Sequence, residues 1–294
     1  KADSLSFDAK TRLLSLKSGN STLVSVTIPT VRIFPFSQGT DAQIAEMIKA
    51  ADRGEIDLYA DAGWRVGDER QITIDAMEAS GTYDGVSWTV GETHASQTVT
   101  LILLDGGTTS ETGSAFTGSA ASDYELVKSV YNKDGTRRTN PAFIVGLKGI
   151  LDAGGYMNST RTNSGSWGGC ARRNWCNGAF RESLNALIPA FKKFKTITTE
   201  AWGSTTLQTV QDYFTFAAAK EVYGSDDYSS NENERNALKQ FAYYAPRNNR
   251  KKGWQYWERS PRYTQAFMTY NWVDSANTDH YAADTYGISP IGCI

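Results

Sequence analysis

The chain of 294 residues is 40% hydrophobic and 21% charged, a composition typical of a folded globular protein with room for one large domain or two smaller ones. Thirty basic and 32 acidic residues leave a net charge of −2, so charge gives no reason to expect a nucleic-acid or anionic-membrane partner. The longest apolar runs, such as Leu101–Leu104, are far too short to span a bilayer, and the first residues carry no signal-peptide pattern. We therefore expect a soluble chain with no nucleic-acid partner and no membrane insertion.

Residues 1–35 predict a small β hairpin. Apolar residues alternate on both sides of a turn-rich break at residues 17–20, namely Leu14, Leu16, Val24, Val26 and Ile28. Pro35 marks the boundary to the rest of the chain. Because a lone hairpin is only marginally stable in water, this segment must pack on the main domain, on copies of itself or on a larger assembly. We expect it to attach or oligomerise the protein.

Residues 36–294 predict a second, larger unit that begins with a helix and two strands. The helix covers Asp41–Arg53, where apolar residues recur at helical spacing on one face. The strands cover Arg70–Ile74 and Thr98–Leu104. The stretch Gly106–Ser119 is rich in Gly, Ser and Thr, which indicates an exposed loop.

The middle of the chain predicts a further helix. Arg181–Phe194 has amphipathic spacing, and Pro189 within it predicts a kink or a break. Helices and strands alternate in no βαβ rhythm along the chain. This pattern favours an α+β domain.

The chain has only three cysteines and two histidines, and this limits the metal and redox chemistry that we expect of it. Cys170, Cys176 and Cys293 form no CxxC pair, and His94 and His280 are the only histidines. A structural zinc site needs four such ligands close together, so we expect no metal and no cofactor. Buried free thiols are the favoured interpretation, while a disulfide between Cys170 and Cys176 stays open.

Six segments occur in an order that resembles a known family. They are Gly63–Asp68, Thr98–Leu104, Cys170–Asn177, Lys220–Gly224, Tyr256–Pro261 and Tyr286–Ile294. Together they resemble the DUF6273 family, which is found in gut phage and prophage tail proteins and in related Firmicutes proteins. The resemblance extends over roughly Trp64–Ile294.

This resemblance implies a C-type-lectin-like domain, in the branch that includes formylglycine-generating-enzyme-like domains. It also implies relatives whose codons near the C-terminus are rewritten by diversity-generating retroelements. Frame residues at matching positions flank the variable stretch, namely Trp257, Arg259, Ser260, Pro261, Gly287 and Pro290. Glu258 and Gly292 depart from the family, which usually has a hydrophobic residue at the first position and often a bulky one at the second.

The segment from about residue 254 to 287 has the composition of a binding surface. Nine of the 33 residues from Trp254 to Tyr286 are aromatic, against 12% of the whole chain, and polar residues alternate with them. Tyr and Trp offer rigid contact area, while Asn, Ser and Asp adapt their hydrogen bonds. The alternative is that these rings fill a core, and we expect Trp257 and Phe267 to pack inward. The residues predicted to be exposed together and to bind ligand are Arg262, Tyr263, Thr269, Tyr270, Trp272, Asp274, Asn277, Asp279, His280, Tyr281 and Asp284.

We predict a non-enzymatic ligand- or receptor-binding protein that recognises a protein or glycan on a host cell surface. By the resemblance, it is a phage or prophage tail protein exposed outside the cell, and a homotrimer would suit a tail. Two alternatives remain, a purely structural tail or baseplate component and a formylglycine-generating-enzyme-like oxidase. Against catalysis, Cys170 and Cys176 lie in a motif that looks like scaffold, and His280 lies inside the variable segment.

Overall fold

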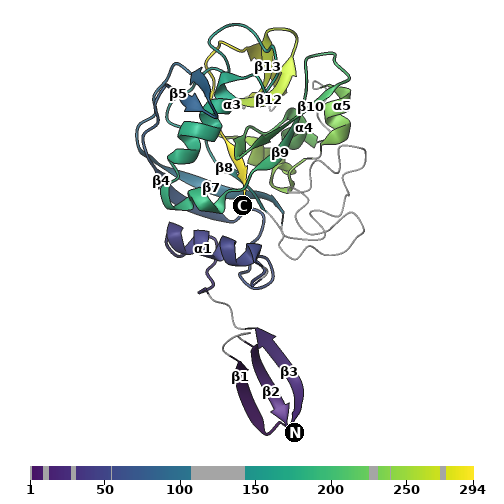
Figure 1. Ribbon diagram of the computed structural model, residues 1–294. Helices are drawn as coiled ribbons and strands as arrows, with labels where there is room; N and C mark the ends of the chain where they lie inside the picture. Colours follow the sequence, from purple (N-terminus) through teal and green to yellow (C-terminus); the bar gives the residue numbers. More distant parts are fainter. Residues whose placement is uncertain are drawn as a thin grey trace.

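The computed structural model describes residues 2–8, 13–27, 31–53, 55–106, 143–224, 231–238, 240–271 and 276–294. It is a mixed α/β structure with mostly sheet and few, short helices. Figure 1 shows a rounded body with a small sheet set apart at the N-terminal end. Of the helices formed by the described residues, none is both long and apolar enough to cross a membrane.

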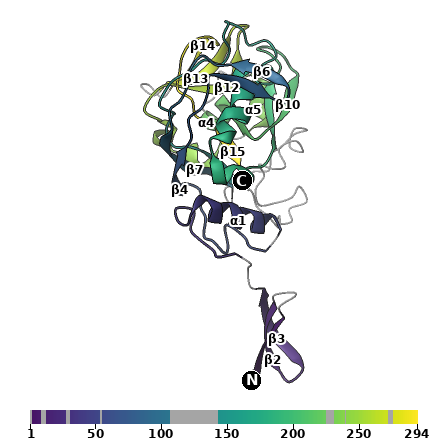
Figure 2. The same cartoon turned by 60° about the vertical axis from the view of Figure 1, so that its left-hand side comes forward.

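The N-terminal sheet has three antiparallel strands, β1 (Ser4–Asp8), β2 (Leu13–Ser18) and β3 (Ser21–Thr27), in the order β1-β2-β3. The expected hairpin is β2–β3, and β1 adds a strand that the sequence pattern did not predict. The register places Leu5 and Val24 on either side of Leu16, on one face of the sheet. These three side chains are exposed, and the sheet stands apart from the body in two views (Figures 1 and 2).

The main body begins just after this sheet, since Phe34 and Phe36 already belong to its core. The predicted helix is confirmed as α1 (Asp41–Asp52), with Ile44, Met47, Ile48, Ala50 and Ala51 among its buried residues. Its N-cap is Thr40, whose hydroxyl accepts a hydrogen bond from the Gln43 backbone at 3.2 Å while the Gln43 side chain accepts one from the Thr40 backbone at 2.8 Å. This reciprocal pair is a capping box and satisfies two otherwise unpaired donors.

A five-stranded antiparallel sheet forms the centre of the body. Its order is β11-β15-β8-β7-β4. The strands are β4 (Glu69–Ile74), β7 (Gln97–Gly106), β8 (Phe143–Leu147), β11 (Phe214–Thr215) and β15 (Ile291–Cys293). The two strands predicted from the sequence are therefore confirmed as β4 and β7. The loop predicted over Gly106–Ser119 lies outside the described residues, apart from the last residue of β7.

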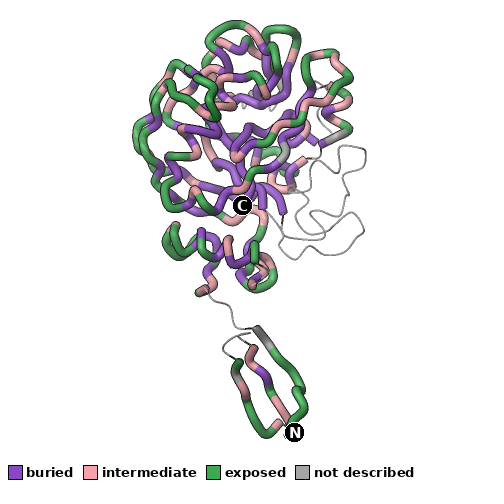
Figure 3. Tube along the Cα trace, viewed as in Figure 1, coloured by how far each residue is buried: buried purple, intermediate pink, exposed green. Residues whose placement is uncertain are grey.

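Both faces of this sheet are buried. Leu101 and Leu103 of β7 pack into one apolar cluster, and Ile102 and Leu104 pack into a second cluster on the opposite face. Successive residues of a strand point to opposite faces, so a strand covered on both sides is apolar throughout. Figure 3 shows the buried residues gathered in the middle of the body, around this sheet.

The helix predicted over Arg181–Phe194, with a kink or a break at Pro189, is wrong in its extent and type, because only the short 3-10 helix at Asn185–Ala190 forms within most of this range. The chain is helical earlier, in α3 (Ala171–Trp175) and the π-helical turn η2 (Cys176–Phe180), and it then forms a 3-10 helix, η3 (Asn185–Ala190). Asn185 has a φ of 51°, which interrupts the right-handed helical path. Pro189 lacks the N–H that a regular helix would use, and the short 3-10 helix ends at the next residue, Ala190.

The remaining elements are short hairpins, short helices and a last three-stranded sheet. They include the hairpins β5 (Ser80–Tyr83) with β6 (Val86–Thr89) and β9 (Phe194–Thr199) with β10 (Leu207–Asp212). Short helices follow, namely α4 (Ala219–Tyr223), α5 (Glu232–Ala237), η5 (Ala242–Tyr244) and η6 (Arg247–Arg250). The last sheet has the order β12 (Tyr256–Arg262), β13 (Ala266–Asn271), β14 (Ala276–Tyr281) and lies at the end opposite the N-terminal sheet.

Candidate functional site

The site is built on β12, whose residues Tyr256–Pro261 are all buried. Arg259 holds this strand through an ion pair with Glu221 of α4 at 2.6 Å. Its guanidinium also donates to the carbonyl oxygens of Phe216 at 2.6 Å and Ile197 at 3.1 Å. A buried ion pair is stable only when further hydrogen bonds satisfy the charges, and these two carbonyls do so.

A second buried carboxylate extends the network. Ser260 donates its hydroxyl hydrogen to Glu234 of α5 and accepts a hydrogen bond from the Ala219 backbone at 2.9 Å. Glu234 also accepts from the backbone of Thr199 at 3.0 Å. Burial raises the pKa of Glu234, while the hydrogen bond from Ser260 opposes that rise. β12 is thereby tied to β9, α4 and α5.

The other end of the segment is fixed at Gly287. Its N–H donates to the carbonyl of Gln255 at 2.8 Å, and its carbonyl accepts from the Trp257 backbone at 3.0 Å. A Cβ at this position would lie 2.9 Å from the Gln255 oxygen, so only glycine fits without a shift. Trp257 is buried and donates its indole hydrogen to the Gly155 carbonyl at 2.7 Å. The prediction that Trp257 and Phe267 pack inward is confirmed.

Gly292 also has a packing explanation. A Cβ there would lie 2.6 Å from the Phe214 ring and 2.9 Å from the Phe191 ring. These two rings lie 4.6 Å apart between centroids and occupy the space that a side chain at position 292 would fill. Glu258, the other departure from the family pattern, is buried.

Between the two fixed ends lies an open pocket of about 460 Å³, here called the recognition pocket. It is lined by Tyr263, Thr264, Gln265, Ala266, Asp279, His280, Tyr281 and Asp284. Five of these residues were predicted from the sequence to bind ligand. Tyr263 is 52% exposed and Tyr281 is 44% exposed, so both rings are available for contact. The volume is within the range of small-ligand sites.

The turn between β12 and β13 carries Tyr263 and is held by one buried side chain. The amide of Asn163 donates to the carbonyl oxygens of Tyr263 and Ala266, each at 2.8 Å, and to that of Arg262 at 3.3 Å. Tyr263 itself has a φ of 49°, a conformation that residues with a side chain rarely adopt. The turn is thus defined by long-range contacts rather than by its own sequence.

Two residues from distant segments extend the surface around the pocket. Trp202, in the loop between β9 and β10, lies 5.7 Å from the Tyr263 ring, and the Arg262 guanidinium lies over the Trp202 ring at 4.0 Å. The Arg161 guanidinium lies over the Tyr281 ring at 4.4 Å. Sequence analysis missed Asn163, Trp202 and Arg161. The only signal was a tryptophan inside a Gly- and Ser-containing turn, Ala201–Ser204.

His280 connects the pocket to the frame. Its Nδ1 is 2.6 Å from the Tyr286 hydroxyl, and the two rings lie 4.2 Å apart between centroids, with their planes tilted by 43°. Tyr286 packs edge-on against Trp257 at 5.2 Å. Burial lowers the pKa of His280, although Asp284 and Asp279 act in the opposite direction.

The prediction that Thr269 is an exposed site residue is wrong. Thr269 is fully buried and hydrogen-bonds Gln255 at 2.7 Å and Thr278 at 2.9 Å. The reason is that β13 is the middle strand of its sheet and Thr269 lies on the same face as the buried Phe267. Trp272 and Asp274 lie outside the described residues, as do the side chains of Tyr270 and Asn277.

The cysteines are free thiols, as the favoured interpretation expected, and all three are buried. Cys170 donates its S–H to the Met157 carbonyl at 3.0 Å. Burial raises the pKa of Cys170 to about 11 and that of Cys176 well above its ordinary value. Both thiols therefore stay protonated at neutral pH, a state that is unfavourable for nucleophilic or metal-binding chemistry.

Comparison with known proteins identifies one family. The model of a domain of unknown function, DUF6273, matches residues 142–294, slightly more than half of the chain. The match contains β8, the frame segments and the recognition pocket, whereas Gly63–Asp68 and Thr98–Leu104 lie before it. Neither the curated proteins nor the solved structures give a match. With its frame strand β12 and its C-terminal strand β15 inside the matched region, the chain belongs to the DUF6273 family.

Proposed function

We propose that this protein binds a ligand, without catalysis, through a recognition surface made of the recognition pocket together with Arg161, Trp202 and Arg262. One observation carries the proposal. Five of the residues that were predicted to bind ligand line a single pocket. Buried contacts hold both ends of the segment that carries them in place. Exposed aromatic rings beside Asp, His and Arg side chains provide rigid anchors with adaptable polar neighbours.

The proposal extends to the fold type and the biological setting. We take the main body to be a C-type-lectin-like domain, and residues 254–287 to be the variable segment of a retroelement-diversified phage or prophage tail protein. Its partner would be a protein or glycan on a host cell surface. The arrangement supports this, because exposed residues such as Tyr263, Asp279 and Tyr281 can change while Arg259, Ser260 and Gly287 keep the ends fixed.

The N-terminal sheet fits an attachment role in the same scheme. The sheet lies at the end of the molecule opposite to β12–β14 (Figure 1). Its exposed apolar face contains Leu5, Leu16 and Val24. A sheet with one apolar face left in water gains stability by packing on another surface. Association of three copies through this sheet would leave the recognition surfaces pointing away from the point of attachment.

The structural-component and enzyme alternatives are less well supported. A purely structural part needs no open pocket lined with unburied aromatic rings. An oxidase of the formylglycine-generating type needs a reactive cysteine pair, and burial keeps Cys170 and Cys176 protonated. His94 is also unsuited to hydrolysis, because it is buried with Nδ1 on Asp152 at 2.8 Å and Nε2 facing Glu92 at 3.8 Å.

The test uses labelled protein on fixed cells from a panel of gut bacterial strains, measured by flow cytometry. If a strain binds the parent chain, the double variant Tyr263→Ala/Tyr281→Ala should bind at least about thirtyfold more weakly, since a hot-spot aromatic contributes about 2 kcal/mol or more. Its free energy of unfolding should change by no more than about 1 kcal/mol, because both rings are exposed. Val86→Ala, also at an exposed apolar residue, is the matched control. Unchanged cell binding by the double variant would refute the proposed surface.

A further inference from the structure

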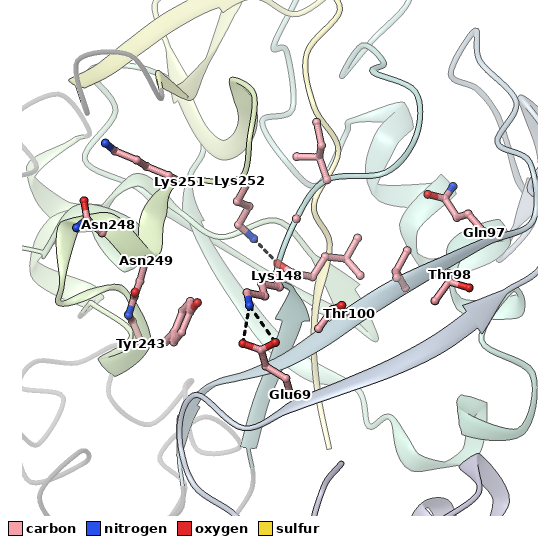
Figure 4. A pocket seen from close by; sticks show the side chains of 14 residues that line it. Glu69, Gln97, Thr98, Thr100, Lys148, Tyr243, Asn248, Asn249, Lys251 and Lys252 are labelled. Carbon is pink, nitrogen blue, oxygen red and sulfur yellow. Dashed lines mark hydrogen bonds and ion pairs between the residues drawn. The ribbon is translucent and has the colours of Figure 1, made fainter. Parts of the chain in front are cut away.

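A second pocket lies away from the recognition surface. It is an open cavity of about 740 Å³ between the edge of β7, the turn after β8 and the segment from η5 to Lys252. Its polar lining includes Lys148, Lys251, Lys252, Tyr243, Asn248 and Asn249, and it is here called the lysine pocket (Figure 4). None of its lining residues belongs to the recognition pocket.

The charges that line this pocket do not balance. Three lysines and one carboxylate, that of Glu69, are among its described lining residues. Lys148 pairs with Glu69 at 2.7 Å, as the dashed lines in Figure 4 mark, so these two charges cancel. Lys251 and Lys252 are then the basic groups that remain among the described lining residues, and an anion is the ligand that this wall attracts.

Lys252 is the unusual member of the set. The residue is only 7% exposed, and its ammonium donates to the Leu147 carbonyl and the Ser289 hydroxyl, both at 2.6 Å. Both acceptors are neutral. The Ser289 hydroxyl lies 3.1 Å from the Gly149 carbonyl, to which it donates, so its oxygen is left to accept from Lys252. Within the described part of the chain, no carboxylate pairs with this amine and nothing accepts its third N–H.

A buried cation without a counter-charge is costly, and burial accordingly lowers the pKa of Lys252 to about 7. The Tyr244 and Tyr256 rings, 5.6 Å and 5.2 Å from the amine, compensate only in part. A ligand anion in the pocket would supply the missing negative charge. It would also accept the unused N–H.

The rest of the lining favours a ligand with hydroxyl groups. Asn248, Thr98 and Thr100 present small polar side chains to the cavity, and Tyr243 adds a phenol (Figure 4). The Asn248 amide makes no hydrogen bond to the described residues, so its donors and acceptor are available. Such groups bind sugar hydroxyls by paired hydrogen bonds.

We infer that the lysine pocket binds an anionic saccharide, a polyhydroxylated ring that carries a carboxylate or a phosphate, with Lys252 at the anion. This site is independent of the recognition surface. Lys148 with Glu69, Lys251 and the phenols of Tyr243, Tyr244 and Tyr256 are the other charged or titratable groups around it.

The test is isothermal titration calorimetry of the full chain at pH 7 with glucuronate, glucose 6-phosphate and methyl glucoside. We expect at least one of the two anions to bind and the neutral sugar to show no heat; which anion binds distinguishes a carboxylate from a phosphate. Lys252→Met should weaken that binding at least about tenfold, because it removes a charge-assisted hydrogen bond. Lys193→Met, at an exposed lysine outside the pocket, should leave it unchanged.

Two further measurements keep the result decisive. At pH 7.5, titrations in buffers of different ionisation enthalpy should show proton uptake on binding, and the Lys252→Met chain should lose it. If Lys252→Met does not fold, Asn248→Ala/Lys251→Gln, at two exposed positions, should weaken binding in its place. The Tyr263→Ala/Tyr281→Ala chain should bind the anion normally, which separates this site from the proposed function. Binding of neither anion, or equal binding by parent and pocket variants, would overturn the inference.

Discussion

Tyr263 is held in a left-handed backbone conformation, with a φ of 49°. Such a conformation costs a residue with a side chain on the order of 1 kcal/mol, which glycine avoids. The Asn163 amide stabilises the turn by donating to its carbonyls. We attribute this conformational free energy to the role of the position, which is to present an exposed ring at the pocket and not to stabilise the fold.

We therefore expect Tyr263→Gly to leave the free energy of unfolding unchanged or to raise it by up to about 1 kcal/mol, while cell binding falls. Urea denaturation and flow cytometry measure the two quantities on the same preparation. A loss of more than about 1 kcal/mol of stability would show that the ring supports the core.

Lys252 gives a prediction for pH dependence. The unfolded chain keeps this proton up to a pKa near 10.4, whereas the folded chain releases it near 7. The unfolded state therefore binds more protons between these values, so Lys252 makes the free energy of unfolding rise with pH, by at most about 1.4 kcal/mol per unit. Below pH 7 both states are protonated and the full cost of the buried charge remains.

Relative to Lys252→Met, the parent chain should thus gain stability steadily from pH 7 to pH 10 and show a constant difference below pH 6. Denaturation midpoints across this range measure the difference between the two chains. A flat difference throughout would mean that the amine is not buried as a cation without a counter-charge.

At the scale of elements, the periodicity of apolar residues predicted those helices and strands that are regular and determined by their local sequence. The helix α1 and the strands β4 and β7 follow directly from apolar spacing. The expected inward packing of Trp257 and Phe267 is also confirmed. The amphipathic pattern of Arg181–Phe194 predicted a longer helix than the one that forms. The positive φ of Asn185 interrupts the helical path, and Pro189 lies inside the short 3-10 helix that follows.

The site was predictable only in part. Composition identified Tyr263, Asp279, His280, Tyr281 and Asp284, which line one pocket. Thr269 could not be assigned to the correct face without knowing that β13 is a middle strand. Asn163, Trp202 and Arg161 reach the site from about 60 to 120 residues away in the chain, and no local pattern encodes such contacts.

The frame around β12 depends on a buried pair, Arg259 with Glu221. Arg259→Met should lower the free energy of unfolding by about 3–5 kcal/mol, because it leaves the carboxylate of Glu221 without its counter-charge. The double variant Arg259→Met/Glu221→Gln should lose less than the sum of the two single changes by at least about 1 kcal/mol. Urea denaturation of the four chains tests this, and simple additivity would show that the two charges do not act together.

At the scale of the whole molecule, the two ends have different surfaces. The N-terminal sheet carries an exposed apolar face, and the β12–β14 end carries aromatic and charged side chains around a pocket. These two parts lie at opposite ends of the molecule (Figure 1). An assembly formed through the first end leaves the second free. The proposed function, recognition by a protein attached to a tail, requires this division.

Light scattering should accordingly give the parent chain a mass above that of one copy, and Val24→Glu should reduce it by placing a charge on the apolar face. Ser25→Glu, at the next position on the opposite face, is the matched control and should leave the mass unchanged. The single-copy mass of 32.3 kDa for the parent chain would contradict association of copies through this sheet.

In the proposed function, the side chains of the recognition pocket can change without loss of the fold. A display library randomised at Tyr263, Asp279, His280, Tyr281 and Asp284 tests it most directly, with protease resistance reporting folding and selection on an unrelated protein, such as egg-white lysozyme, reporting binding. We predict that most members resist protease as the parent does and that selection yields variants that bind lysozyme, which the parent does not. A library in which most members are unfolded, while a library at the exposed control positions Ser87 and Thr89 stays folded, would contradict the account.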